Sequence, residues 1–188
     1  MSLLINFIAF QLGWFACVLG AANGMPWLGP IVVAAAVVLH LVRARRPRPE
    51  LWLICSAMVL GLAVDSLLLA TGWLSYPSGL WLPGLAPYWI VAMWALFATT
   101  LNVSMGWMRG RPLLAVVMGA VGGPLSYLAG QKLGGIELNQ TTYALAALAV
   151  AWAVAMPLLS WLAARLDGVR ETTVPGFVQR DWRASNHA

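Results

Sequence analysis

Gly119-Ala-Val-Gly-Gly-Pro-Leu-Ser-Tyr-Leu-Ala-Gly-Gln-Lys-Leu-Gly134 lies inside an apolar segment, yet it contains five glycines and a proline. Small residues recur at every fourth position, so a helix would carry them on one side: Gly122, Ser126, Gly130 and Gly134. In lipid, such a stripe lets helix backbones approach closely. Pro124 removes an amide donor and predicts a kink near the preceding glycine pair. We therefore predict that this helix is the central one of a bundle, with its kink and packing set by Gly119, Gly122, Gly123, Pro124 and Gly130.

The composition is that of a membrane protein. Of the 188 residues, 61% are hydrophobic and only 9% are charged, whereas soluble domains carry roughly 25% charged residues. Such a chain cannot cover a water-exposed surface, which excludes disordered, collagen-like and nucleic-acid-binding classes. The net charge of +5 comes largely from arginines in short loops. This distribution follows the positive-inside rule and does not indicate a phosphate-binding face.

Six apolar segments are predicted to be transmembrane helices: residues 3–22, 27–42, 51–70, 88–105, 113–133 and 143–164. Arginines cluster at residues 43–48 and recur at Arg109 and Arg111, and arginines mark cytoplasmic loops. We therefore predict an all-α polytopic protein with six transmembrane helices and both termini in the cytoplasm. Residues 1–166 would form a single transmembrane domain, and residues 167–188 a polar cytoplasmic tail that is partly disordered.

Asp65 is the only acidic residue inside a predicted span. It lies 14 residues after Leu51, roughly 21 Å along the helix, in the outer half of the bilayer. A carboxylate there is costly unless it is paired, hydrated or protonated, so a functional role is the default interpretation. The alternative is a protonated carboxyl that bonds a neighbouring helix.

Polar residues of the fifth segment reach a depth similar to that of Asp65. We predict a polar pocket of Asp65, Ser126, Tyr127, Gln131 and Lys132. Two alternatives stay open, with Lys132 as an interface anchor and Tyr127 as a residue of the aromatic belt.

A second polar patch is expected at the inner end, from Asn6, His40 and Asn102, with Ser104 at a similar depth. His40 precedes the arginine cluster, so we interpret it as a solvated helix-end residue rather than a ligand or proton relay. Trp94 and Trp152 fall in mid-span and are expected to pack rather than to bind.

The sequence predicts neither a metal site nor a cofactor. Metal sites need several His, Cys or carboxylate ligands, and no two suitable residues share a helix face. A Ser–His–Asp arrangement needs hydrogen-bond contact, whereas His40 and Asp65 are predicted near opposite membrane faces. The glycines of residues 119–134 lack the lysine spacing and the preceding strand of a phosphate-binding loop.

Five motifs carry a family resemblance: Asn6-Phe7, Gln11-Leu-Gly-Trp-Phe-Ala-Cys17, Asp65, Pro87-Tyr-Trp-Ile90, and Gly122-Gly-Pro-Leu-Ser-Tyr127 with Gly130. Over about residues 3–165 the chain resembles a family of small bacterial inner-membrane proteins classed as a domain of unknown function. The resemblance implies a location in the bacterial inner membrane and supplies no catalytic residue. Relatives are often encoded beside cyclopropane-fatty-acyl-synthase-like methyltransferases and flavin oxidases, which implies work connected with fatty-acyl chains.

Three functions are compatible with these observations. The first is the binding or handling of a lipid or fatty-acyl molecule in an intramembrane pocket around Asp65 and the kinked fifth helix, with the uncharged, aromatic loop of residues 71–87 as a lid. The second is a small proton-coupled transporter in which Asp65 exchanges a proton. The third is an assembly partner that forms homo- or hetero-oligomers through the glycine stripe. Membrane lipids are the partners common to all three.

Overall fold

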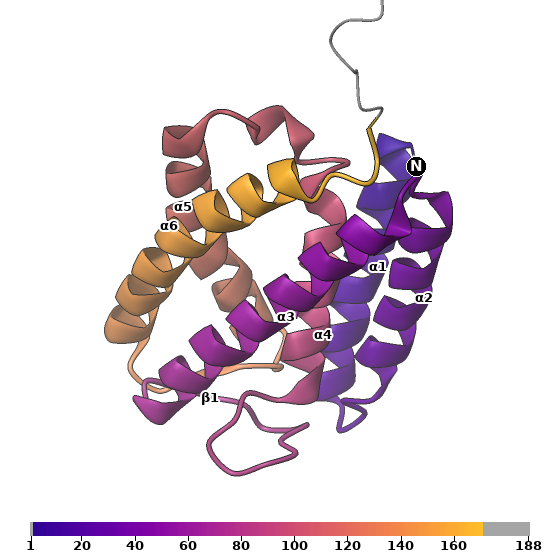
Figure 1. Ribbon diagram of the computed structural model, residues 1–188. Coiled ribbons are helices and arrows are strands. Elements are labelled where there is room, and N and C mark those ends of the chain that lie inside the picture. Colours follow the sequence, from indigo (N-terminus) through magenta and orange to yellow (C-terminus); the bar gives the residue numbers. More distant parts are fainter. Residues whose placement is uncertain (1, 171–188) are drawn as a thin grey trace, which may run out of the picture.

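The computed structural model describes residues 2–170, and within them the chain forms six α-helices (Figure 1). Their bounds are α1 (Leu3–Ala22), α2 (Leu28–Arg43), α3 (Pro47–Ala70), α4 (Tyr88–Leu101), α5 (Pro112–Lys132) and α6 (Thr141–Arg165). A 3-10 helix, η1 (Gly106–Met108), follows α4, and two short strands, β1 (Leu74–Ser75) and β2 (Glu137–Leu138), lie in other loops. The predicted helical fold is confirmed. The largest shifts are at the start of the third helix, residue 47 instead of 51, and at the end of the fourth, residue 101 instead of 105.

Helix ends follow local chemistry. Ser2 caps α1, because its Oγ accepts the backbone amide of Ile5 at 3.3 Å. Pro47 and Pro112 begin α3 and α5, where a missing amide hydrogen breaks no helical bond. Gly134 has a φ of 84° just after α5, the left-handed conformation that ends helices. It therefore belongs to a turn and not to the predicted stripe.

The helical surface is that of a membrane protein. Four helices are long and apolar enough to cross a bilayer: α1, α3, α5 and α6. Large apolar side chains such as Phe7, Val59 and Val121 are exposed on them, which is unfavourable in water. With 16 and 14 residues, α2 and α4 extend roughly 24 and 21 Å, less than a hydrocarbon core of roughly 30 Å. Six spans and cytoplasmic termini therefore stay predictions.

The central helix is α4. It packs against α1, α2 and α3 and also touches α6, and its Trp89, Trp94 and Leu96 are buried. By contrast, α5 packs mainly on α6, and this pair stands at one side of the bundle (Figure 1). The prediction that the fifth helix is central was wrong. Small residues indicate how closely a helix approaches a neighbour, but they do not indicate how many neighbours it has.

Both ends of the bundle are tied by loop contacts. At one end β1 pairs antiparallel with β2, with Leu74 opposite Leu138. The loop of residues 71–87 is thereby anchored to the α5–α6 turn, which does not suit a free lid. At the other end the arginine loops meet the chain after α6. Arg46 Nη2 donates to the Asp167 carbonyl at 2.6 Å, and Arg109 Nη1 pairs with the Asp167 carboxylate at 2.8 Å.

Candidate functional site

Asp65 is the centre of a buried hydrogen-bond cluster, and its side chain has no exposed surface. Tyr76, from the loop after α3, donates its hydroxyl to Oδ1 at 2.7 Å. Trp94 of α4 donates Nε1–H to Oδ2 at 2.7 Å, and Tyr127 of α5 donates its hydroxyl to Oδ1. A buried carboxylate needs such donors to offset its lost hydration. The single acid therefore ties α3, α4, α5 and the loop of residues 71–87 together.

The sequence predicted only one of these three partners. Asp65 and Tyr127 were placed in one pocket, and the structure brings them into contact. Trp94 reaches Asp65 because Gly61, one turn earlier in α3, has no side chain: a Cβ there would lie 2.1 Å from Trp94 Cγ. An indole N–H in mid-span needs an acceptor, and this requirement is the sequence signal from which the contact with Asp65 could have been predicted. Tyr76 lies in a loop, and its sequence position gave no such signal.

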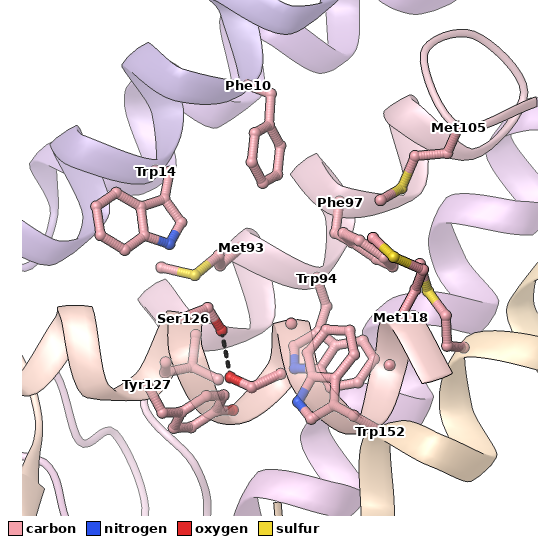
Figure 2. Close-up of a pocket in the computed structure, with 15 residues that line it drawn as sticks. Phe10, Trp14, Met93, Trp94, Phe97, Met105, Met118, Ser126, Tyr127 and Trp152 are labelled. Carbon is pink, nitrogen blue, oxygen red and sulfur yellow. Dashed lines mark hydrogen bonds between the residues drawn. The ribbon is translucent and has the colours of Figure 1, made fainter. Parts of the chain in front are cut away.

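Beside this cluster lies a cavity of about 250 Å³, between α1, α4, α5 and α6 (Figure 2). Its walls are aromatic, sulfur-containing and glycine-rich: Phe10, Trp14, Ile90, Met93, Trp94, Phe97, Met105, Met118, Gly119, Gly122, Gly123, Ser126, Tyr127, Trp152 and Met156. Trp94 and Tyr127 thus belong to both the wall and the Asp65 cluster. Asp65 itself lies behind the wall.

The cavity reaches the surface of the molecule between α1 and α5. Gly122 and Met118 of α5 are exposed, and Trp14 of α1 is half-buried. Figure 2 shows Trp14 and Tyr127 on opposite sides of the Met93 side chain. The exposed residues beside the opening are apolar, as at Val121, so the opening faces the surface that contacts lipid.

Two glycines let α5 approach α6 and so form one wall. A Cβ at Gly119 would lie 2.1 Å from the Trp152 carbonyl oxygen, and a Cβ at Gly123 would lie 2.3 Å from Trp152 Cγ. Gly122 has open space around it, and Gly130 meets the turn after α5 rather than another helix. The helix–helix contact therefore uses a different face from the predicted stripe. The helix continues through its internal proline, so the predicted kink does not end it.

The other predicted pocket residues take different places. Ser126 lines the cavity and donates its hydroxyl to the carbonyl of Gly123 at 2.7 Å. Gln131 is half-buried and Lys132 is exposed at the end of α5. Neither of them is among the residues that line the cavity or bond Asp65. The exposed lysine suits the interface-anchor alternative.

Trp152 of α6 completes the aromatic part of the cavity wall. Its ring stacks on that of Trp94, with centroids 4.6 Å apart, and Phe97 packs against it edge-on at 5.3 Å. In Figure 2 both indole nitrogens lie on the side of Tyr127. The buried Nε1 of Trp152 faces the hydroxyl of Tyr127, whose oxygen can accept from it while the hydroxyl donates to Asp65.

A second buried cluster surrounds Glu50 at the other end of α3. Glu50 has no exposed surface. Its Oε2 lies 2.8 Å from His40 Nε2, and its Oε1 accepts from Asn102 Nδ2 at 2.8 Å and from the Gly168 amide at 2.7 Å. Arg109 extends the cluster by donating to Asn102 Oδ1 at 2.8 Å. The cluster holds α2, α3, the end of α4 and the chain after α6 together.

The interpretation of His40 as a solvated residue was wrong. It is 1% exposed and contacts Glu50, which lies two residues after the arginine cluster of residues 43–48. Asn102 shares this cluster with His40. Asn6 does not, since it donates to a backbone carbonyl of α4 at 3.1 Å and accepts the Ser104 hydroxyl at 2.5 Å. The predicted inner patch thus consists of two separate sets of hydrogen bonds.

Asp167 anchors the segment after α6. Its carboxylate accepts the amides of Val169 and Arg170 at 2.9 and 3.0 Å and pairs with Arg109. Burial acts to raise the pKa of Asp167, but these donors outweigh burial and hold the pKa below its ordinary value. Residues 167–170 of the predicted tail are therefore packed against the helices, whereas residues 171–188 lie outside the described residues.

These features define a class, an integral membrane protein with a lateral apolar cavity and a buried carboxylate behind its wall. The chain belongs to the family described as "Protein of unknown function (DUF2878)", which matches residues 3–158. The predicted resemblance to a family of unknown function is thereby confirmed. No curated protein and no solved structure matches the chain. In the part of the chain that the structure describes, no group of three His, Cys, Asp or Glu residues is placed to hold a metal ion.

Proposed function

We propose that the protein binds the apolar chain of a membrane lipophile, of the fatty-acyl type, in the cavity between α1 and α5. One observation carries the proposal, namely that an apolar cavity of about 250 Å³ opens on the lipid-facing surface. An apolar cavity of about 150 Å³ accepts one benzene, so roughly ten carbon atoms fit here. This corresponds to part of an acyl chain, the rest of which would leave through the opening into the bilayer.

The cavity lining supports selective binding. Moving a chain from lipid into an apolar cavity gains no hydrophobic free energy, because both surroundings are apolar. Selectivity must then come from dispersion and shape. Methionine side chains are polarisable and adapt to irregular shapes, and four of them line this cavity: Met93, Met105, Met118 and Met156.

Asp65 acts in this proposal as a positioning residue. Its carboxylate already accepts three hydrogen bonds, and it fixes Trp94 and Tyr127, which form part of the wall. The sequence-based hypothesis placed Asp65 in contact with the ligand, whereas we now assign it to the support behind the wall. The same burial disfavours the proton carrier, because a carrier's carboxylate must meet a path for protons.

The test is native mass spectrometry with lipid extraction on the detergent-purified full chain. In Gly122→Phe, a ring enters the cavity at a position where an added Cβ meets nothing within 4 Å. A phenyl group needs about 150 Å³ of space, more than half of the cavity. We expect wild type to retain a defined acyl-bearing species that Gly122→Phe loses.

The matched control is Val121→Phe, which adds the same ring one residue earlier on the lipid-facing side of α5. It should retain the species found in wild type. Bulk phospholipid bound equally to all three proteins would refute the proposed function.

A further inference from the structure

We infer that the bound acyl lipid carries an anionic head group, a carboxylate or a phosphate, and that Arg111 pairs with this head group. This inference rests on the proposed function, because it names the head group and the orientation of the ligand of the same cavity. Its basis is the opening between α1 and α5, which is closed at one end of the bundle and leads to Arg111 at the other. That other end carries the arginine loops and lies at the top of Figure 1.

The end of the bundle that holds the β1–β2 pair closes the opening. There the turn after α5 lies against the last turns of α1. A Cβ on Gly135 would lie 3.0 Å from the Val18 carbonyl oxygen, and a Cβ on Gly134 would lie 3.4 Å from Ala22 Cβ. The part of an acyl chain that extends out of the cavity therefore has its room on the side of the arginine loops.

Arg111 lies on the face of α5 that borders the opening. It belongs to the start of this helix, since its carbonyl accepts the Ala115 amide at 3.1 Å. Met118 and Gly122, which are exposed at the opening, follow Arg111 by seven and eleven residues, intervals that return a helix to the same side. Gly122 is then roughly 16 Å from Arg111 along the helix axis. An acyl chain fills one leaflet, roughly 15 Å, so a lipid with its head group beside Arg111 would place its methyl end in the cavity.

Arg111 also lies at the depth of lipid head groups. With 21 residues, α5 is roughly 31 Å long and matches a hydrocarbon core of roughly 30 Å. Arg111 directly precedes this helix, at the boundary of the core. Trp107, in the 3-10 helix just before it, is 51% exposed, and exposed tryptophan is typical of the membrane interface.

The side chain of Arg111 is available for a ligand. Two neighbouring arginines are held by the protein, because Arg109 pairs with the Asp167 carboxylate and Arg46 donates to the Asp167 carbonyl. The side chain of Arg111 is exposed and has no hydrogen bond or ion pair in residues 2–170. A guanidinium presents paired N–H donors that match the oxygens of a carboxylate or a phosphate. The head group that complements this site is therefore an anion.

Three probes test the head group on the delipidated full chain in a nonionic detergent: stearic acid, stearyl phosphate and stearyl alcohol. They share one saturated chain, so their affinity ratios isolate the head group. At a pH that ionises both acids, we expect the better acid to bind about three- to fivefold more tightly than the alcohol, as for an exposed ion pair. The acid with the larger advantage would identify the head group as carboxylate or phosphate. Equal affinity for all three probes would overturn the inference.

Two variants assign the cation. In Arg111→Gln the charge is removed, so the affinity ratio of acid to alcohol should fall toward one. The matched control is Arg48→Gln, which removes an exposed charge at the same end of the bundle on α3, a helix that contributes no residue to the cavity wall. Its ratio should stay at the wild-type value. An unchanged ratio in Arg111→Gln, or an equal loss in both variants, would overturn the inference.

Photochemical labelling tests the orientation of the ligand. Two stearic acids are used, with a diazirine near the methyl end or near the carboxyl group. The methyl-end probe should label residues of the cavity wall such as Trp14 and Trp152, and the carboxyl-end probe should label the chain beside Arg111. The reverse pattern would overturn the inference.

Failure of this inference is distinguishable from failure of the proposed function. If all three probes bind wild type equally and are lost in Gly122→Phe, only the inference about Arg111 fails. If no probe binds wild type, or if binding survives Gly122→Phe, the proposed function fails as well.

Discussion

Replacing Gly119 by Ala should separate α5 from α6, whereas the same replacement at Gly122 should not. A Cβ at Gly119 would lie 2.1 Å from the Trp152 carbonyl oxygen, where carbon and oxygen normally approach no closer than about 3.3 Å. The two helices must therefore move apart by roughly 1 Å, which forfeits a quarter to a half of each dispersion contact across the interface. Such overpacking costs about 1–3 kcal/mol.

The Gly122 variant is the matched control because both glycines lie within α5. Either Gly→Ala change gains up to about 1 kcal/mol of helix propensity, so the difference between the two variants isolates the overpacking, about 1–3 kcal/mol. At about 2–4 °C per kcal/mol, Gly119→Ala should melt several degrees below Gly122→Ala when unfolding is followed by tryptophan fluorescence in detergent. Equal melting temperatures, or a lower one for Gly122→Ala, would refute the assignment of the packing face.

Three further predictions concern the acids that hold hydrogen-bond clusters together. In Asp65→Asn the carbonyl oxygen can still accept from both tyrosines, but the new amide group meets the indole N–H of Trp94, donor against donor. The free energy of unfolding should therefore fall by about 1–3 kcal/mol; wild-type stability would contradict a side chain that accepts at both oxygens. Glu50→Ala should release the segment after α6 and speed tryptic cleavage after Arg165, whereas the exposed Glu137→Ala should not; equal rates would count against docking. The pKa of Asp167 is about 3.9 in the unfolded chain and lower in the folded protein. The ionised carboxylate therefore stabilises the fold above about pH 3.9, and this stabilisation is lost as the pH falls through the native pKa. Asp167→Asn should therefore melt below wild type at pH 7, and the gap should close below about pH 4; a gap that widens in acid would contradict this.

Helix positions could be predicted from the sequence because the length of each apolar segment and the charged residues beside it are properties of the local sequence. The errors at the ends have local causes too. The third helix begins at Pro47, inside the arginine cluster, since proline fits the first turn of a helix. The fourth ends at Leu101, where the chain turns before η1. Hydropathy extended that span through residues that form a turn.

The candidate site was less predictable because its contacts join distant segments. Asp65 and Tyr127 could be paired because both were predicted to lie at a similar depth in the membrane. That depth follows from the predicted order of the transmembrane helices. Trp94 needed the further knowledge that Gly61 faces it. A pocket beside the fifth helix was predicted, but its apolar lining and its position in front of Asp65 were not, because they depend on Gly119 and Gly123 facing Trp152 of α6.

Glu50 shows how sequence neighbours mislead. It follows four arginines, a setting typical of a solvated loop, yet it is the centre of a buried cluster. One of its donors is the amide of Gly168, 118 residues later, which no local pattern reveals. The prediction for His40 was wrong for the same reason, since its proximity to the arginine cluster indicated solvent and its contact with Glu50 depends on the fold.

The ties at both ends of the bundle, the β1–β2 pair and the Glu50 cluster, leave the side between α1 and α5 as the way into the cavity. A molecule using this entrance would never cross water. The fraction of cavities that this molecule occupies would depend on its mole fraction among the surrounding lipids rather than on an aqueous concentration. Dilution of the membrane with other lipids would then empty the cavity as effectively as removal of the ligand. A change in lipid composition would thus alter the occupancy of the cavity without any water-soluble signalling molecule.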